Sequence, residues 1–242
     1  MSAPVPRVAL VTGASSGVGR AIALALAGPG TRLCLAGRDP GRLEETADEA
    51  RRHGAEASGY RADLEREEDV RGLAAAVLRD AGGVDILVHS AGVIALGTVE
   101  DAPVEELDRH YRINLRAPYV LTRELLITLR GRRGQVVFVN SSVAVASRGG
   151  VGTYAASKHG LKALADSLRC EENPRGVRVF SVFLGRTATA MQALLHEVEG
   201  RAYRPEALLQ PEQVAEMVVR TLGLAPTAEV TDLHIRPAIK GG

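Results

Sequence analysis

Short apolar runs alternate with longer amphipathic stretches along almost the whole chain, and this alternation is the feature that most limits the fold. The runs lie at residues 7–12, 32–37, 58–63, 84–90, 135–141, 177–183 and 230–235, and helical patterns lie near 17–27, 40–53, 66–81, 103–130, 153–172 and 211–222. Strands joined by crossover helices form parallel sheets, and runs rich in Val, Leu and Ile suit strands buried on both faces. The pattern therefore predicts an α/β fold, a doubly wound parallel sheet forming a single domain over residues 1–242.

Local signals support two of the helix starts. Asp39-Pro40 is typical of an N-cap followed by proline at the first helical position, and Asp101-Ala102-Pro103 resembles it. Residues 186–210 have the least regular pattern, so we expect a substrate lid or a loose helical insert there.

Composition excludes several classes of protein. The 242 residues include 30 basic and 29 acidic side chains, so the net charge of +1 favours neither nucleic acid nor an anionic membrane surface. Cys34 and Cys170 form no disulfide framework or metal-ligand spacing, and we expect no metal site. No apolar run approaches the roughly 18 residues of a membrane span, and the N-terminus does not resemble a signal peptide. We therefore expect a cytoplasmic enzyme.

A glycine-rich turn follows the first apolar run. Thr12-Gly13-Ala14-Ser15-Ser16-Gly17-Val18-Gly19 leads into an alanine-rich helical pattern. At such a junction, backbone N–H groups and the positive end of the helix dipole can hold a pyrophosphate. The spacing GxxxGxG differs from the usual dinucleotide GxGxxG and from the P-loop, and a plain tight turn is the alternative. Its place after the first strand favours dinucleotide binding.

Arg38 stands at the end of the second predicted strand, where a dinucleotide fold contacts the adenosine ribose. An acidic residue there binds the 2′-hydroxyl of NAD, whereas an arginine accommodates the 2′-phosphate of NADP. Asp39 competes for the first role, but capping the next helix already explains it. We therefore expect NADP(H), with a solvated surface charge as the alternative for Arg38.

Tyr154 and Lys158 lie one helical turn apart, on the same face of a predicted helix. The lysine charge, together with a cationic nicotinamide, would lower the pKa of the phenol from its ordinary value of about 10. Such a tyrosine could exchange a proton with a carbonyl or alcohol oxygen during hydride transfer. A YxxxK pattern by itself is common and usually has no chemical role.

Taken together, these motifs resemble the short-chain dehydrogenase/reductase family over almost the full chain. The matching segments are TGASSGVG (12–19), Asp63-Leu64, SAG (90–92), Asn114, NSS (140–142), YAASK (154–158), and Gly185 with Thr189. The resemblance implies strand order 3-2-1-4-5-6-7 and a homo-oligomer, a tetramer or dimer, with the helices near 103–130 and 153–172 at an interface. It also implies a catalytic tetrad of Asn114, Ser141, Tyr154 and Lys158.

The resemblance likewise implies a set of cofactor contacts. Asp63 would contact the adenine, Lys158 the nicotinamide ribose, and Thr187 and Thr189 the carboxamide. The full predicted set is Gly13, Ser15, Ser16, Gly17, Val18, Gly19, Arg38, Asp63, Leu64, Ser90, Ala91, Gly92, Tyr154, Lys158, Gly185, Thr187 and Thr189.

The chain departs from the family pattern at two places. His89-Ser90-Ala91-Gly92 replaces the usual Asn-Asn-Ala-Gly, and Leu184-Gly185 replaces the usual Pro-Gly. His89 is either a second acid/base or a strand-end histidine bonded to nearby backbone, and we favour the latter. Pro118, which has no N–H, leaves the carbonyl of Asn114 without its usual helical partner. That carbonyl could hold a relay water, with an incidental kink as the alternative.

The combined pattern predicts an NADP(H)-dependent oxidoreductase that interconverts a small-molecule carbonyl and an alcohol. Apolar residues in the lid segment and after the serines, including Val143, Val145, Met191, Leu194 and Leu195, favour a mainly apolar substrate. One alternative is a non-catalytic NADP-binding sensor or scaffold, although such a protein needs no tetrad. A sugar-nucleotide epimerase shares the YxxxK pattern but usually has a larger substrate domain.

Overall fold

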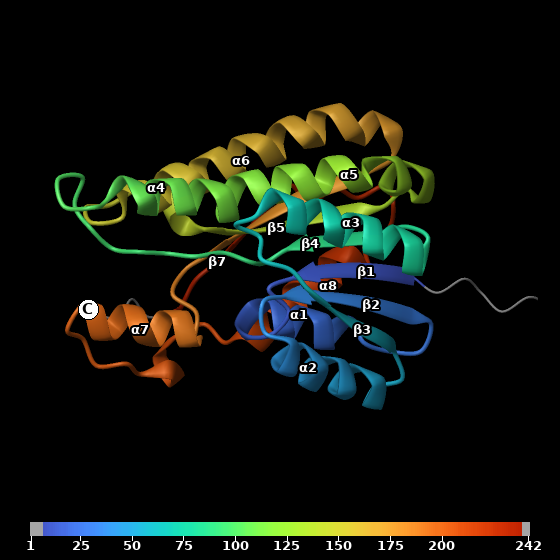
Figure 1. The fold of residues 1–242 in the computed structure, drawn as a ribbon, viewed down its shortest axis with the longest axis horizontal. Helices are drawn as coiled ribbons and strands as arrows, with labels where there is room; N and C mark the ends of the chain where they lie inside the picture. The colour runs from blue at the N-terminus through green and yellow to red at the C-terminus, as the bar shows by residue number, and fades with distance from the viewer. Residues whose placement is uncertain (1–6, 239–242) are drawn as a thin grey trace, which may run out of the picture.

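The computed structural model describes residues 7–238, in which parallel strands form one sheet with helices on both faces (Figure 1). The seven strands have the order β3-β2-β1-β4-β5-β6-β7, as the family resemblance implied. They are β1 (Arg7–Thr12), β2 (Thr31–Gly37), β3 (Glu56–Arg61), β4 (Ile86–His89), β5 (Gln135–Ser141), β6 (Arg178–Leu184) and β7 (Asp232–Ile235). The predicted fold class is confirmed.

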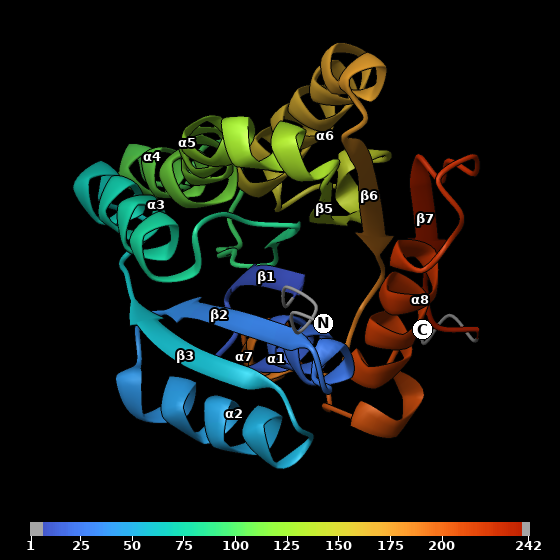
Figure 2. The ribbon, with the colours of Figure 1, turned by 90° about the vertical axis from the view of Figure 1, so that its right-hand side faces the viewer.

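The helices form two layers that enclose the sheet (Figure 2). One layer contains α1 (Gly17–Leu26), α2 (Pro40–Arg52) and α8 (Pro211–Leu222); the other contains α3 (Glu67–Ala81), α4 (Val104–Tyr111), α5 (Ala117–Arg132) and α6 (Gly152–Glu172). Apart from these, α7 (Ala190–Val198) lies within the irregular segment predicted as a lid. No helix among residues 7–238 is long and apolar enough to cross a membrane.

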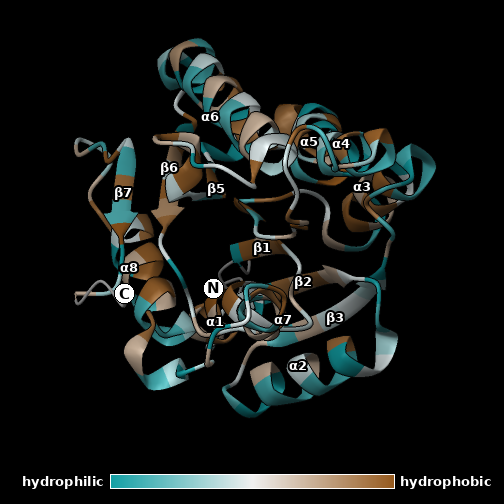
Figure 3. Cartoon of the chain, turned by 90° about the vertical axis from the view of Figure 1, so that its left-hand side faces the viewer, coloured by the Kyte–Doolittle hydropathy of each residue, from teal (hydrophilic) through white to brown (hydrophobic). Residues whose placement is uncertain are grey.

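Two apolar clusters, one on each face of the sheet, make up the core. Side chains from alternating positions of β1 enter opposite clusters, with Val11 on the α1 side and Leu10 on the α5 side. Figure 3 shows this arrangement as hydrophobic residues concentrated on the central strands and hydrophilic residues on the outer surfaces of α2 and α6. Burial on both faces is why the strand sequences are nearly continuous in Val, Leu and Ile.

Local hydrogen bonds help to set where β3, α2 and α4 begin or end. β3 starts and ends two residues earlier than expected; beyond its end, the N–H of Asp63 donates to the Asp69 carboxylate (2.9 Å) instead of extending the ladder. Asp39 caps α2 as predicted by accepting from Arg42 N–H (3.1 Å). Asp101 is not an N-cap, since its carboxylate accepts from the Thr98 hydroxyl (2.6 Å) and α4 begins after Pro103.

The helix predicted over 103–130 is interrupted in the middle. A π-helical turn (Arg112–Arg116) separates α4 from α5, and the N–H of Ala117 donates to the carbonyl of Arg112, five residues earlier. Pro118 follows immediately and cannot donate, which weakens the ordinary helical ladder at this point. Such turns are frequent at functional sites, and this one contains Asn114.

A buried carboxylate ties α6 to α5 and provides a test of the packing. Glu172 is 1% exposed and accepts two hydrogen bonds from Arg130 (both 2.7 Å), with Arg175 at 3.3 Å. The hydrogen bond from Arg130 lowers the pKa of Glu172, so its contribution to stability exists above the ordinary glutamate pKa and is lost as the pH falls through the lowered value.

We therefore predict that Glu172→Gln lowers the urea midpoint of unfolding at pH 7 by roughly 0.5 M. The difference from the wild type should shrink towards acidic pH, because the wild-type carboxylate is then protonated as well. Glu216→Gln is the matched control, since Glu216 pairs with Arg220 on the exposed face of α8. An equal shift at every pH would contradict the assignment.

Candidate active site

A cavity of about 500 Å³ lies at the carboxyl edge of the sheet, where the chain leaves six of the strands. The cavity brings together residues that are far apart in sequence. The predicted site residues that line it are Gly13, Ser15, Ser16, Gly17, Val18, Gly19, Arg38, Asp63, Leu64, Ser90, Ala91, Gly92, Ser141, Tyr154, Lys158, Gly185, Thr187 and Thr189. Asn114, which completes the predicted set, is buried behind the wall of the cavity.

Strands β1 and β4 diverge at the middle of this edge, and Thr12 joins their ends. Its buried hydroxyl accepts from the N–H groups of Ser90 (3.1 Å) and Ala91 (3.2 Å) and donates to the Val88 carbonyl (3.3 Å). After β1 the chain enters α1 in one helix layer, and after β4 it leads to α4 and α5 in the other layer. An open parallel sheet binds ligands in the crevice at such a reversal of strand order.

The glycine turn after β1 packs too closely for side chains. A Cβ on Gly19 would lie 2.4 Å from the Gly13 carbonyl oxygen, and one on Gly13 would lie 2.9 Å from the Ala91 backbone. Gly13 and Gly17 also have positive φ angles of 69° and 54°, which glycine adopts without strain. The turn ends at the start of α1, so its shape fits the predicted pyrophosphate cradle.

The far end of the cavity carries the predicted adenosine contacts. Arg38 follows β2, is exposed, and forms no ion pair with any described residue. Asp63 follows β3 and accepts from the N–H of Glu65 (3.1 Å). Because Asp39 is engaged as the cap of α2, Arg38 is the charged residue at the end of β2 that stays available to a ligand.

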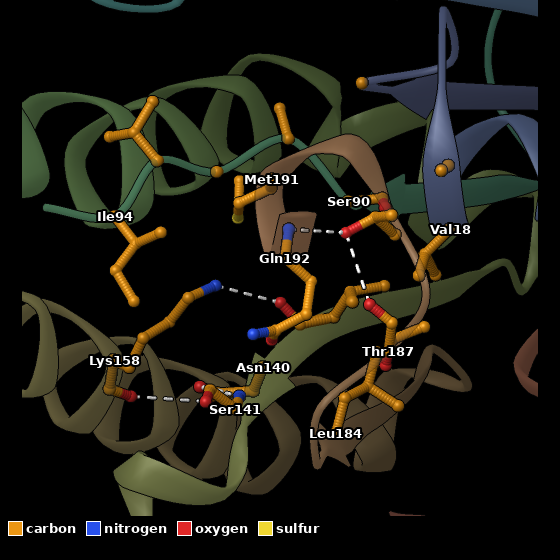
Figure 4. Close-up of a pocket in the computed structure, with 18 of the residues that line it drawn as sticks. Val18, Ser90, Ile94, Asn140, Ser141, Lys158, Leu184, Thr187, Met191 and Gln192 are labelled. Atoms are coloured by element: carbon orange, nitrogen blue, oxygen red, sulfur yellow. Dashed lines mark hydrogen bonds between the residues drawn. The ribbon is translucent and has the colours of Figure 1, made fainter. Parts of the chain in front are cut away.

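Lys158 is held deep in the cavity wall on α6. Its ammonium donates to the carbonyl of Val139 (3.0 Å), and its own carbonyl accepts from the Asn140 side chain (3.2 Å), as Figure 4 shows. Burial lowers the pKa of Lys158 to about 8. Asn140 also accepts from the N–H of Ser141 (2.8 Å), so this amide links the end of β5 to α6. Sequence reasoning noted Asn140 only as part of the NSS motif.

Tyr154 is half-buried one turn before Lys158. Burial raises the pKa of its phenol above the ordinary value, and the neighbouring Ser141 hydroxyl opposes part of this rise. Desolvation outweighs the hydrogen bond from Ser141, and a lowered pKa stays a prediction for the site with a cationic nicotinamide bound. The tyrosine keeps its proton in this environment at neutral pH.

Asn114 does not line the cavity, but its side chain binds residues on two elements that do. Its amide donates to the Val93 carbonyl (2.9 Å) and the Ser157 hydroxyl (3.0 Å), and its oxygen accepts from Val93 N–H (2.9 Å). Ser157 in turn donates to the Tyr154 carbonyl (2.7 Å). The side chain thus fixes backbone on both sides of the cavity.

His89 lies behind the cavity and does not line it. It is 3% exposed, its Nε2 lies 2.8 Å from the Thr122 hydroxyl, and its ring stacks on Phe138 at 5.0 Å. Burial lowers its pKa to about 3, so the ring stays neutral. The favoured interpretation as a strand-end residue fits this position, except that its partner is a side chain and not backbone.

The segment predicted as a lid contains α7, which covers one side of the cavity. Thr189 caps α7 by accepting from Gln192 N–H (3.2 Å). Met191, Leu195 and Val143 line the cavity as expected, whereas Leu194 (63%) and Val145 (55%) point into solvent. Polar residues that sequence reasoning did not assign to the site also line it, namely Asn140, Arg148 and Gln192.

A family model described as short chain dehydrogenase matches residues 7–200, most of the chain. The chain belongs to the short-chain dehydrogenase/reductase family. The dehydrogenase/reductase SDR family member 11 of Bos taurus is 31% identical over 96% of both chains. Solved structures of similar fold include an alcohol dehydrogenase of the archaeon Thermococcus sibiricus with 5-hydroxy-NADP (TM-score 0.88) and the actinorhodin polyketide ketoreductase with NADPH (TM-score 0.89). Each is 29% identical and covers 98% of both chains.

This member of the short-chain dehydrogenase/reductase family keeps its sheet intact at the Leu184-Gly185 departure. Leu184 pairs with Ile235 in β7, and the N–H of Gly185 donates to the Ile235 carbonyl (2.8 Å). The ladder therefore continues to the edge of the cavity without the family's usual proline.

The two serines at the end of β5 have different surroundings. Ser141 is half-buried beside Tyr154, whereas Ser142 is exposed and begins a short 3₁₀ turn.

We predict that Ser141→Ala lowers kcat by about 10²–10³, because one polarising donor is lost, with NADPH affinity little changed. Ser142→Ala should cost less than roughly tenfold. Steady-state kinetics with NADPH binding followed by fluorescence checks both, and a larger loss for Ser142→Ala would reverse the assignment.

Proposed function

We propose that this protein is an NADP(H)-dependent oxidoreductase that interconverts a ketone or aldehyde and the corresponding alcohol. The observation that carries the proposal is that one cavity is lined by the glycine turn after β1 and by Ser141, Tyr154 and Lys158. NADP(H), when bound, supplies or accepts the hydride. The cavity thus combines a turn suited to dinucleotide binding with side chains that can donate or accept a proton.

The proposed roles follow from the position of each side chain. Tyr154 donates its proton to a carbonyl oxygen, or removes it from an alcohol. Ser141 polarises the same oxygen, because it neighbours the phenol. Lys158 is anchored by Val139 so that its charge lies near Gly92, where it would bind the nicotinamide ribose. Asn114 anchors the relay that replenishes the proton, by analogy with the family.

The proposed cofactor contacts begin at the glycine turn, which receives the pyrophosphate at the start of α1. Asp63 would contact the adenine, and Thr187 and Thr189 would hold the nicotinamide carboxamide; all three line the cavity. Three solved structures of similar fold are complexes with NADP or NADPH, which supports the choice of cofactor. Arg38 is then the residue that selects the 2′-phosphate.

The proposed substrate is mainly apolar and enters under residues 186–210. Ile94, Val143, Met191 and Leu195 line the same cavity as Tyr154. These side chains favour a hydrocarbon portion beside the reacting carbon.

We further infer a single catalytic domain, a cytoplasmic location and a homo-oligomer. Tyr119 and Ile127 are exposed on one face of α5, and Leu107 and Tyr111 are exposed on α4. Exposed apolar side chains gathered on neighbouring helices mark interaction surfaces, which supports an interface through these helices.

The Tyr154→Phe variant tests the proposed function against the alternative of a non-catalytic NADP-binding sensor. We expect the wild type to oxidise NADPH with members of a panel of ketones and aldehydes, and the variant to lose about 10²–10⁴ in kcat. Both proteins should bind NADPH equally, as followed by fluorescence. Binding without turnover of any panel member by the wild type would favour the sensor.

Cofactor choice gives a second prediction. NADPH should support a kcat/KM roughly ten- to a hundredfold above that for NADH, because hydrogen bonds to charged groups contribute about 1.5–3 kcal/mol. Arg38→Asp should abolish or reverse the preference by placing a carboxylate against the 2′-phosphate. Arg42→Asp is a control, since Arg42 is exposed nearby on α2 and does not line the cavity. Equal use of both cofactors by the wild type would contradict this assignment.

A further inference from the structure

His110 on α4 is fully buried and has no place in the proposed mechanism so far. Its Nε2 accepts a hydrogen bond from the backbone N–H of Ala95 (3.0 Å), in the loop that follows β4. An acceptor nitrogen carries no proton, so the proton of the neutral ring is on Nδ1. Nδ1 makes no hydrogen bond to a described residue. Among the described residues, the imidazole therefore makes one hydrogen bond, and it is to this loop.

Asn114, one helical turn after His110, holds the same loop. Its side chain binds both the N–H and the carbonyl of Val93 (2.9 Å each). His110 and Asn114 therefore hold the backbone on either side of Ile94, with three hydrogen bonds in all. Ile94 lines the cavity on the side of Lys158 (Figure 4). Fixing residues 93 and 95 determines where the Ile94 side chain stands.

His110 also contacts the proposed acid/base. Its ring lies edge-on to the ring of Tyr154, with centroids 5.8 Å apart and an interplanar angle of 63°. This is a favourable geometry for two aromatic rings. The charged groups around the imidazole are Glu106 and Arg109 on α4 and Lys158 on α6, and burial lowers its pKa, so the ring stays neutral.

We propose that His110 is a positioning residue that holds the loop carrying Ile94 and the ring of Tyr154 in register for a bound substrate. The inference rests on the proposed function, because its consequence for catalysis presupposes turnover at Tyr154. It acts through one acceptor atom, Nε2, and through one ring edge. A displacement of about 1 Å in such a support can cost roughly 10²-fold in rate.

The test compares substitutions that differ in where they place an acceptor. Gln can place an amide oxygen near the position of Nε2, whereas the shorter Asn cannot reach it and Leu offers no acceptor. We expect His110→Leu and His110→Asn to lower kcat about ten- to a hundredfold with the Kd for NADPH changed less than about twofold. His110→Gln should recover most of the rate. His53→Leu is the matched control, because His53 is exposed at the end of α2.

Amide hydrogen exchange of the segment 92–97 supplies a readout that does not require turnover. Exchange should be faster in His110→Leu and His110→Asn than in the wild type, and near the wild-type rate in His110→Gln. Wild-type rates and exchange in all three variants, or a Gln variant as impaired as the Leu variant, would overturn the proposal. If the Leu variant does not fold, the comparison of His110→Gln with His110→Asn tests the proposal by the same two measurements. If the wild type turns over no substrate but exchange follows the expected order, the loop clamp stands and the proposed function fails.

Discussion

The hydrogen bonds of Thr12 at the point where β1 and β4 part are the contact on which the site depends. The two strands pair along their length, and the chain then leaves them in opposite directions, so backbone N–H groups at the end of β4 would lose their partners. The Thr12 hydroxyl satisfies two of them, and the glycine at position 13 lets the turn approach Ala91 closely. The cavity lies next to the Thr12 hydrogen bonds, and both the glycine turn and the loop carrying Ile94 line it.

Buried amides connect the catalytic groups to the sheet. Asn140 joins β5 to the backbone of Lys158, and Asn114 joins the loop after β4 to Ser157, which binds the backbone of Tyr154. Each amide is buried and satisfied, so the geometry of α6 relative to the sheet is specified by hydrogen bonds as well as by packing. The proposed acid/base therefore sits on a rigid helix, while the opposite wall is a loop that needs its own supports.

Sequence could predict the parts that depend on local patterns. The strands, the glycine turn, the cap at Asp39 and the pairing of Tyr154 with Lys158 on one helix face all follow from neighbouring residues. The contact between His110 and Ala95 joins residues whose proximity depends on how α4 packs, so no local pattern signals it. The burial of Tyr154 is another such feature: spacing along a helix gives the distance to Lys158, but desolvation depends on elements from the whole fold.

The segment over the cavity combines fixed ends with a weakly buried middle. Thr187 forms a bridge with Leu209, and the N–H groups of Ala188 and Leu209 donate to Leu209 and Arg186 carbonyls, so both ends are tied together. Between them, α7 exposes Leu194 and Val198, and its far end is held by Glu199 bonded to Arg186 and Arg148. Ion pairs near solvent contribute little compared with a buried apolar face. Local opening costs least where few apolar contacts are lost, so a lid movement of α7 over the strand ends stays a prediction.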